Sequence, residues 1–349
     1  MNVGGARMHY EILGKSGLKV AELCLGIMTF GKQWGWGSSA PEAKKIIDTY
    51  LEAGGNFIDT TNMHSGGTGE RLLKDFLKSN RDDVVLAAKY TPEKHDAIPD
   101  STTSYNRKNM IQTLEASLKR LDTDYIDIYW VHARDKITAL EEMMRSFDDL
   151  VRSGKVLHIG ISDTPAWIIS KAETLAQLWG WTSISAIQVE YSLAERNAEQ
   201  DLLPMAAALN IAVTARSPLA GGLLTGKYTR GKQLDSSRQP EKTPKQERAE
   251  RELAIAREVD AIADELARPS CQVALNWLLR RGSAIPILGV RTAEQLNEHL
   301  GCLEFRLSQS QMDRLEKISA IDKEYPHNVL DYNRGRRIIY GDFYDRLVF

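Results

Sequence analysis

The amino-acid sequence predicts an α/β fold, a (β/α)8 TIM barrel, and three observations lead to this prediction. Short β-branched or apolar runs alternate with amphipathic helical patterns, and this unit recurs about eight times along the 349 residues. Strict alternation of strand and helix is typical of a parallel sheet that helices cover on both faces. No segment of clearly different amino-acid composition separates the eight strand–helix units, which favours their closure into one barrel. An open doubly wound sheet is the alternative arrangement.

Eight apolar runs are expected to form the barrel strands. They lie near residues 24–30, 57–61, 84–90, 125–132, 157–162, 186–192, 212–217 and 284–289. Before the first of them, residues 8–13 and 18–23 flank Lys15, Ser16 and Gly17, which predicts an N-terminal β-hairpin.

The first helix illustrates the pattern between the strands. Ala43, Ile46 and Tyr50 fall on one helical face. Ser39, followed three residues later by Glu42, predicts a capping box at the start of this helix.

Two segments depart from the repeating unit. Residues 226–250 are rich in Lys, Arg, Gln, Ser and Pro and predict a long loop after strand seven, followed by extra helices near 248–267 and 270–281. The aromatic and basic tail, 326–349, has no clear period, and we expect it over one end of the barrel. With no linker composition in between, we expect a single barrel domain over residues 1–349.

The composition argues against several classes of protein. A formal net charge of -2 gives no electrostatic preference for nucleic acid or an anionic membrane. The apolar runs are shorter than the roughly 18–20 residues of a membrane span, and residues 1–14 lack the apolar core of a signal peptide. Cys24, Cys271 and Cys302 show no metal-ligand spacing, so we expect reduced thiols, no metal site and a cytoplasmic protein.

Polar side chains occur at the end of almost every predicted strand. Because a barrel of this type carries its active site at the carboxyl ends of its strands, these side chains are expected to converge. Asp59, Lys89 and His132 end three neighbouring strands, and Gln188 lies on a fourth. Taken singly, Asp59 and Lys89 are also consistent with a structural ion pair, and His132 with a hydrogen-bonded core histidine.

The loops after strands seven and eight indicate a phosphate site. Ser217 and Gly221 belong to the first loop, and Gly289 and Arg291 to the second. Glycines let backbone N–H groups approach an anion, an arginine can bind phosphate through two hydrogen bonds, and the helix starting near Thr292 directs its positive end there. A solvated loop with an incidental arginine is the alternative.

Several motifs together resemble the aldo-keto reductase family, over residues 8 to about 320. They are Leu-Gly-Ile-Met-Thr-Phe-Gly at 25–31, Gly-Asn-Phe-Ile-Asp-Thr at 55–60, Ile-Gly-Ile-Ser at 159–162, Gln-Val-Glu-Tyr at 188–191 and the glycine-rich run at 217–228. The bacterial and potassium-channel-β-like branch is the most similar. The resemblance implies a barrel that binds NADPH across its top.

The resemblance also implies four catalytic positions. Asp59 pairs with Lys89, and His132 orients the substrate carbonyl. Five residues after the Asp, the family has a Tyr that donates a proton as hydride arrives from the nicotinamide, whereas this sequence has His64. An imidazole must be protonated to be a comparable acid, which Lys89 disfavours and Asp59 favours. His64 therefore has three interpretations. It acts as a replacement general acid, it leaves a polar but weakened site, or it marks a natural or engineered loss of activity.

The remaining cofactor contacts follow from the same resemblance. Ser162 and Gln188 match residues that bind the nicotinamide amide, Asp163 replaces the usual Asn, and Arg216 replaces an aromatic ring. Arg291 is the reason to expect NADP(H) rather than NAD(H). The expected set is Met28, Thr29, Asp59, Ser162, Asp163, Gln188, Arg216, Ser217, Leu219, Gly221, Leu223, Gly289, Arg291, Gln295 and Glu298.

Two functions are consistent with these residues. The first is an NADPH-dependent oxidoreductase that reduces a small aldehyde or ketone to an alcohol by hydride transfer. The alternative is an NADP(H)-binding module or partner subunit with little turnover, because His64 replaces the expected tyrosine. The sequence identifies neither the carbonyl substrate nor the oligomeric state.

Overall fold

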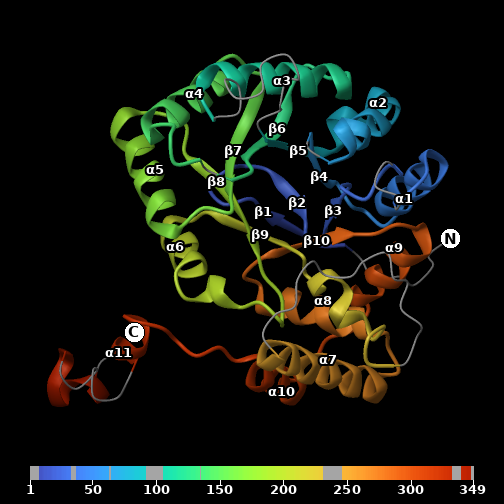
Figure 1. The fold of residues 1–349 in the computed structure, drawn as a ribbon, viewed down its shortest axis with the longest axis vertical. Coiled ribbons are helices and arrows are strands. Elements are labelled where there is room, and N and C mark those ends of the chain that lie inside the picture. The colour runs from blue at the N-terminus through green and yellow to red at the C-terminus, as the bar shows by residue number, and fades with distance from the viewer. Residues whose placement is uncertain are drawn as a thin grey trace.

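Eight parallel strands close into a barrel in the computed structural model of the chain (Figure 1). The structure describes residues 8–32, 37–62, 64–91, 105–133, 135–230, 246–331 and 339–346. Around the barrel the strand order is β10-β3-β4-β5-β6-β7-β8-β9, so each strand pairs with its neighbour in sequence and β10 closes the ring against β3. The predicted closed barrel is confirmed, and the open sheet is excluded.

The strands occur where the apolar runs predict them. The barrel strands are β3 Cys24–Gly26, β4 Phe57–Thr61, β5 Val85–Tyr90, β6 Ile126–Val131, β7 Val156–Ser162, β8 Ile184–Glu190, β9 Ala212–Arg216 and β10 Ile285–Gly289. The hairpin strands β1 Tyr10–Ile12 and β2 Lys19–Ala21 pair antiparallel, as predicted. Strand β3 is shorter than expected because the chain turns after Gly26, where the Phe30 N–H donates to the Ile27 carbonyl at 3.0 Å.

Helices surround the barrel and cover its outer face (Figure 1). They are α1 Ala40–Glu52, α2 Thr68–Asn80, α3 Arg107–Leu121, α4 Leu140–Arg152, α5 Ala166–Trp179, α6 Leu202–Leu209, α7 Gln246–Leu266, α8 Ser270–Arg281, α9 Ala293–Leu300, α10 Gln309–Ser319 and α11 His327–Asp331. Helices α7 and α8 are the two extra helices that the sequence predicts. Most of the predicted loop before them, 231–245, lies outside the described residues.

The apolar residues form two separate cores. The larger one fills the layer between strands and helices, and the smaller one fills the barrel, with Phe57, Ile128 and Trp130 among its members. Leu13 and Val20 of the hairpin region belong to this inner core, so the hairpin covers one end of the barrel. Burying each large apolar side chain contributes about 1.5–3 kcal/mol, which makes the barrel a rigid support for the polar residues at its other end.

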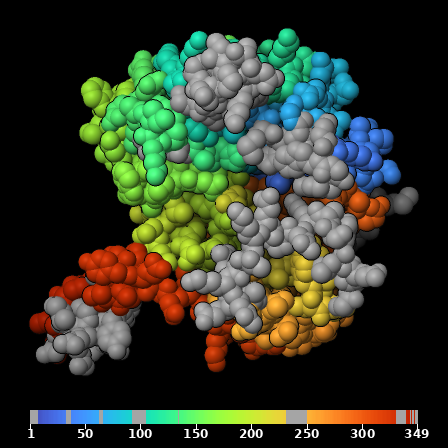
Figure 2. All heavy atoms as spheres, viewed as in Figure 1, coloured from blue at the N-terminus to red at the C-terminus, as the bar shows by residue number. Residues whose placement is uncertain are grey.

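Two local predictions are wrong. Ser39 is the N-cap residue of α1, but its side chain makes no capping hydrogen bond. Glu42 instead accepts a hydrogen bond from the Ala293 N–H at 2.8 Å, so it connects α1 to α9 rather than completing a capping box. The C-terminal tail does not cover a barrel end, because α11 lies beside the barrel and projects away from it (Figures 1 and 2). No helix among the described residues is long and apolar enough to span a bilayer.

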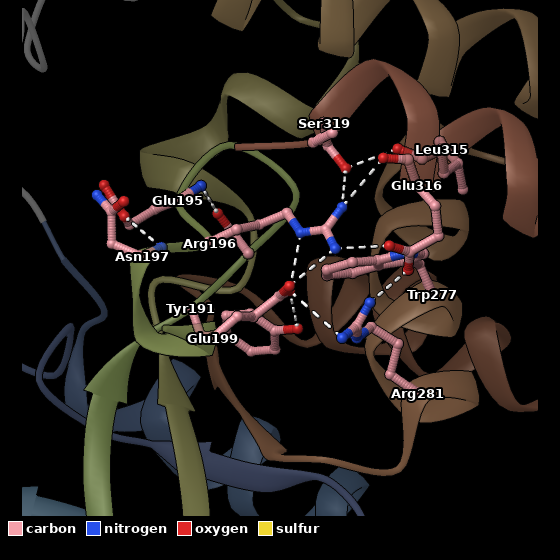
Figure 3. Close-up of polar contacts among 12 residues, drawn as sticks. Tyr191, Glu195, Arg196, Asn197, Glu199, Trp277, Arg281, Leu315, Glu316 and Ser319 are labelled. Atoms are coloured by element: carbon pink, nitrogen blue, oxygen red, sulfur yellow. Dashed lines mark hydrogen bonds and ion pairs between the residues drawn. The ribbon is translucent and has the colours of Figure 1, made fainter. Parts of the chain in front are cut away.

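A buried polar cluster connects the segment after β8 to α8 and α10 (Figure 3). At its centre, Arg196 donates to both carboxylate oxygens of Glu199 at 2.8 and 2.9 Å, to Glu316 at 2.6 Å and to the Ser319 hydroxyl at 2.8 Å. Trp277 donates to Glu316 at 2.9 Å. We call this group the Arg196 cluster; its members are Tyr191, Arg196, Glu199, Trp277, Arg281, Glu316 and Ser319.

Candidate active site

The carboxyl ends of the strands open into one cleft of about 690 Å³. Asp59 reaches it from β4, Lys89 from β5 and Gln188 from β8, while His132 and Asp163 directly follow β6 and β7. These residues are far apart in the chain and meet because parallel strands present their carboxyl ends at the same end of the barrel. The convergence that the sequence predicts is therefore present.

Asp59 and Lys89 form a buried ion pair at the centre of this cleft. The Lys89 ammonium donates directly to Asp59 Oδ2, and the two residues are only 5% and 8% exposed. Gln188 Nε2 lies 3.4 Å from the second oxygen, Asp59 Oδ1. A buried charge is costly unless it is paired, and here each of the two side chains has the other as its partner.

His132 lies half-buried beside this pair and is uncharged at neutral pH. Burial lowers the pKa of His132 below its ordinary value, and the Lys89 ammonium lowers it further, against the opposing effect of Asp163 and Asp59. His132 Nδ1 lies 2.7 Å from the Thr91 hydroxyl. When Thr91 donates to Nδ1, the proton of the neutral ring is on Nε2, which can then donate to an oxygen in the cleft.

A second charged group lies at the rim, where three neighbouring strands end. Arg216 Nε donates to Asp163 at 3.2 Å, and Arg216 Nη2 lies 3.1 Å from Glu190 Oε2. The two carboxylates together hold the guanidinium at the edge of the cleft. All three side chains are at least one-third exposed, so water screens this group far more than the Asp59–Lys89 pair.

The loop after β9 forms a backbone cradle on one wall of the cleft. A 3₁₀ helix, Ala220–Thr225, follows Ser217, and both Gly221 and Gly222 have positive φ, 63° and 95°. A Cβ atom on Gly222 would lie 2.5 Å from the ammonium of Lys227, so only glycine lets this lysine approach the loop. The described residues give Lys227 no carboxylate partner, which leaves a cation beside the glycine loop.

The loop after β10 supplies the opposite wall. The Arg291 N–H donates to Gln295 Oε1 at 2.9 Å, and the Ser38 hydroxyl donates to the Arg291 carbonyl at 2.8 Å. Thr292 caps α9 by accepting from the Gln295 N–H. The backbone of Arg291 is thus fixed, whereas its guanidinium, which lines the cleft, has no ion-pair partner in the described part of the chain.

Most of the residues that the sequence singles out line this cleft. They are Met28, Thr29, Asp59, Lys89, His132, Asp163, Gln188, Arg216, Ser217, Leu219, Gly221, Gly289, Arg291, Gln295 and Glu298. Ser162 is buried, and its hydroxyl has no hydrogen-bond partner among the described residues. Leu223 packs against the hydrophobic core instead. His64 begins a 3₁₀ helix, His64–Gly67, directly after β4, and its side chain lies outside the described residues, as do Trp34 and Trp36.

The further residues that line the cleft, and to which sequence reasoning gives no role, include Lys227, Cys271 and His299. A signal for His299 exists, since it lies four residues after Gln295 and one after Glu298, on the same face of α9. Lys227 belongs to the glycine-rich run at 217–228, which the sequence already placed at the cleft. Cys271 shows no comparable signal, because only the tertiary structure brings α8 to the cleft. The described residues contain no tyrosine in the cleft lining and no cluster suited to a metal ion.

Comparisons with known proteins agree with this geometry. A model of the aldo/keto reductase family matches residues 22–320. The chain belongs to this family. It is 33% identical to norsolorinic acid reductase of Aspergillus flavus over 336 residues, which cover 92% of this chain and 84% of that protein. It is 31% identical to aryl-alcohol dehydrogenase [NADP(+)] of Phanerodontia chrysosporium over 347 residues, 93% and 90% of the two chains.

Membership makes the protein an oxidoreductase of small carbonyl compounds that uses a nicotinamide dinucleotide. The residues of the cleft fit such a cofactor. Ser162 offers a buried hydroxyl that no described residue binds, and the glycine cradle and Arg291 offer donors for phosphate. The relatives are fungal, and the expected bacterial and potassium-channel-β-like branch stays a prediction.

Proposed function

We propose that this enzyme reduces an aldehyde or ketone to an alcohol with NADPH, and that Asp59, Lys89 and His132 form its catalytic centre. One observation carries the proposal. A buried ion pair and a neutral histidine meet at one place in a cleft whose walls carry cations without ion-pair partners among the described residues. A structural ion pair alone does not explain why the cleft is open beside it or why Arg291 and Lys227 face it.

In this proposal each residue of the centre has a separate task. His132 donates a hydrogen bond to the carbonyl oxygen, which fixes the substrate and stabilises negative charge developing on that oxygen. Lys89, held by Asp59, supplies a positive potential beside the proton donor. The bound dinucleotide supplies the hydride. Gln188 and Ser162 hold its nicotinamide amide, and both are buried, which excludes water from that end of the cleft.

The cofactor proposed is NADP(H) rather than NAD(H). Arg291 lines the cleft with no carboxylate partner in the described part of the chain, and its backbone is fixed from both sides. A guanidinium of this kind can bind a phosphate through two hydrogen bonds. The name of the Phanerodontia chrysosporium relative includes NADP(+), which supports the same choice.

His64 is proposed as the proton donor in place of tyrosine. The competing function, an NADP(H)-binding module with little turnover, has this replacement as its only support. The two differ in a measurable way, because a binding module holds NADPH but does not oxidise it.

NADPH consumption with a panel of carbonyl compounds tests the proposal. The panel begins with aryl aldehydes, and aryl alcohols with NADP⁺ test the reverse direction, because an aryl-alcohol dehydrogenase is among the relatives. We expect carbonyl-dependent oxidation of NADPH that Lys89→Met abolishes. Tight NADPH binding without oxidation across the panel would establish the binding module instead.

Two variants of His64 test the proton donor. We expect His64→Ala to slow turnover by about 10²–10⁴-fold near neutral pH, the usual contribution of a general acid. We expect His64→Tyr to retain or raise the rate, because a tyrosine beside an ammonium is a competent acid. Equal rates in His64→Ala and the unaltered enzyme would remove His64 from the mechanism while leaving the other three residues in place.

Arg291→Gln tests the choice of cofactor by fluorescence titration. We expect NADPH affinity to fall about 10-fold to 100-fold, as for the loss of a charge-assisted hydrogen bond, and NADH affinity to stay unchanged. Arg280→Gln is the matched control, because it removes the same charge from an exposed position outside the cleft lining. Equal losses for the two cofactors would show that Arg291 does not distinguish them.

A further inference from the structure

Among the described residues, eight of the fifteen large apolar side chains that are exposed lie in two places. One is α5, which exposes Trp167, Leu178 and Trp179, and the other is the C-terminal arm, which we define as residues 321–346 and describe over 321–331 and 339–346. Scattered exposed apolar residues need no explanation, but a concentration of them marks an interaction site.

On α5 the exposed residues form a stripe. Trp167, Lys171, Thr174 and Leu178 are spaced by four, three and four residues and are all exposed, so they lie along one outward face of the helix. Trp167 is 68% exposed and Leu178 is 76% exposed. The indole ring of Trp179 stacks on that of Trp181 at 5.9 Å, which keeps a flat aromatic surface at the end of the stripe.

A groove runs beside the stripe, between α4 and α5. Its volume is about 250 Å³, and its lining consists of Ala139, Leu140, Glu141, Trp167, Ile168 and Lys171. This volume lies below the roughly 300–1,000 Å³ of typical small-molecule pockets. The groove is therefore suited to a single inserted side chain rather than to a small-molecule ligand.

Helix α6 extends this surface with a wholly uncharged segment. It packs next to α5, and its sequence, Leu-Leu-Pro-Met-Ala-Ala-Ala-Leu, contains no charged residue. Pro204, Ala207 and Ala208 are exposed. The outer helix α3, by contrast, carries five charged residues in fifteen. A helix this apolar on the outside of a barrel is expected to be covered in the working protein.

The C-terminal arm leaves the barrel next to α6. The Glu324 N–H donates to Gln200 Oε1 at 2.9 Å, and His327 Nε2 lies 2.9 Å from Asp201 Oδ1, directly before α6. Beyond these two contacts the arm projects away from the barrel (Figures 1 and 2). The arm exposes Tyr325, Val329, Ile339 and Phe343, and Tyr325 is 82% exposed.

We propose that two copies of this chain form a dimer in which the arm of each packs on the α5–α6 surface of the other. The arm projects from the side of the barrel where α5 and α6 lie, so a two-fold arrangement brings each arm to its partner's surface (Figure 1). Tyr325 and Phe343 can bury roughly 150–250 Å² each, a substantial part of the roughly 800 Å² per partner in a specific interface. An aromatic side chain of the arm occupies the groove between α4 and α5.

Light scattering coupled to size-exclusion chromatography tests the dimer with the full chain. We expect a mass of twice the 39.2 kDa of one chain. Two variants attack the two halves of the interface, Trp167→Lys combined with Leu178→Lys on α5, and Val329→Lys combined with Phe343→Lys on the arm. Each is expected to weaken the dimer at least tenfold, since buried aromatic anchors dominate such interfaces. Ile12→Lys, which changes an exposed apolar residue of the hairpin, is the matched control and is expected to leave the dimer intact.

Cross-linking between chains tests the exchange itself. All three native cysteines are buried, so cysteines introduced at Leu178 in one chain and Phe343 in another can be joined selectively by a bifunctional maleimide. A cross-linked product in the mixture of the two variants supports the exchange. A monomer at every concentration, a dimer insensitive to either pair of substitutions, or cross-linking only within a chain that carries both cysteines would each overturn it. CD spectra and NADPH titration confirm that the variants are folded.

Discussion

The Arg196 cluster and the Asp59–Lys89 pair are both built around buried charges, and they differ in how fully their hydrogen-bonding groups are used. In the Arg196 cluster the guanidinium donates to Glu199, Glu316 and Ser319, and those acceptors are in turn bound by Tyr191, Trp277 and Arg281 (Figure 3). Among the described residues, Gln188 is the further side chain that bonds to the Asp59–Lys89 pair, and the pair faces an open cleft.

This difference separates a structural group from a functional one. A charged group whose hydrogen-bonding atoms all bind other protein groups cannot also bind a ligand. Its interactions instead hold segments of the chain together. A charge that faces open space with capacity left can act on a bound molecule. The comparison therefore predicts that substitutions in the two groups affect different measured quantities.

The largest expected effect is that of Lys89→Met. Hydride transfer from NADPH should slow by about 10²–10⁴-fold, because the positive potential beside the proton donor is lost. The free energy of unfolding should fall by about 3–5 kcal/mol, because the buried Asp59 carboxylate loses its partner. Single-turnover kinetics measure the first effect and urea unfolding the second.

The double variant Asp59→Asn with Lys89→Met separates these effects. It removes both charges, so most of the lost stability should return while the rate stays low. Recovery of the rate together with the stability would mean that the pair is only structural, which is the alternative that the sequence leaves open.

Arg196→Met is expected to show the opposite pattern. It leaves the half-buried Glu199 and Glu316 with Arg281 alone as a cationic partner, so the free energy of unfolding should fall by up to about 3–5 kcal/mol. NADPH affinity and the rate of hydride transfer, measured well below the unfolding transition, should stay within about twofold. A large loss of cofactor affinity in this variant would contradict the separation of the two groups.

The fold could be predicted from the sequence because its signal is periodic. Alternating apolar runs and helical faces place all eight strands, and the convergence of Asp59, Lys89 and Gln188 follows from the parallel arrangement alone. The predicted capping box at Ser39 was wrong because Glu42 forms a tertiary contact instead. Its carboxylate accepts a hydrogen bond from the first residue of α9, which is distant in the sequence. Local spacing carries no information about such a partner.

The sequence could predict a site residue only where that residue lies at the end of a strand or in a motif of the family. The Arg196 cluster was missed because its members come from three segments spread over more than a hundred residues, and none of these segments stands out in the sequence. The direction of the C-terminal arm was also wrong, because a tail without periodicity gives no signal of what it packs against. His299 illustrates an intermediate case, since helical spacing places it on the cleft face of α9 but cannot show that it is buried.

His299 provides a pH-dependent test of the comparison. Its Nδ1 is buried without a hydrogen-bond partner in the described part of the chain, and burial lowers the pKa of His299 to about 4. The folded protein therefore keeps this ring neutral, while the unfolded chain takes up a proton below about pH 6.5. The contribution of His299 to stability is complete above pH 6.5 and is lost as the pH falls to about 4, by about 3 kcal/mol.

His299→Asn should remove this part of the pH dependence. The loss of unfolding free energy between pH 7 and pH 4 should be about 3 kcal/mol smaller in the variant than in the unaltered enzyme. His9→Asn, at an exposed position, is the matched control and should leave the pH dependence unchanged. Urea unfolding at several pH values measures it, and identical pH profiles for His299→Asn and the unaltered enzyme would show that the ring is not kept neutral by burial.

The smallest effect is expected at the rim, where Arg216 is paired but solvated. Glu190 is 46% exposed, and pairs of this kind contribute about 0–1 kcal/mol. Glu190→Gln should therefore change the free energy of unfolding by less than about 1 kcal/mol and NADPH affinity by less than about threefold, because Asp163 still holds the guanidinium. A tenfold loss of affinity, absent in the matched variant Glu195→Gln, would show that Glu190 positions Arg216 against the cofactor. In that case the solvent exposure of a side chain would be a poor guide to its function in this cleft. The Arg216 group at the rim would then have to be counted with the functional Asp59–Lys89 pair.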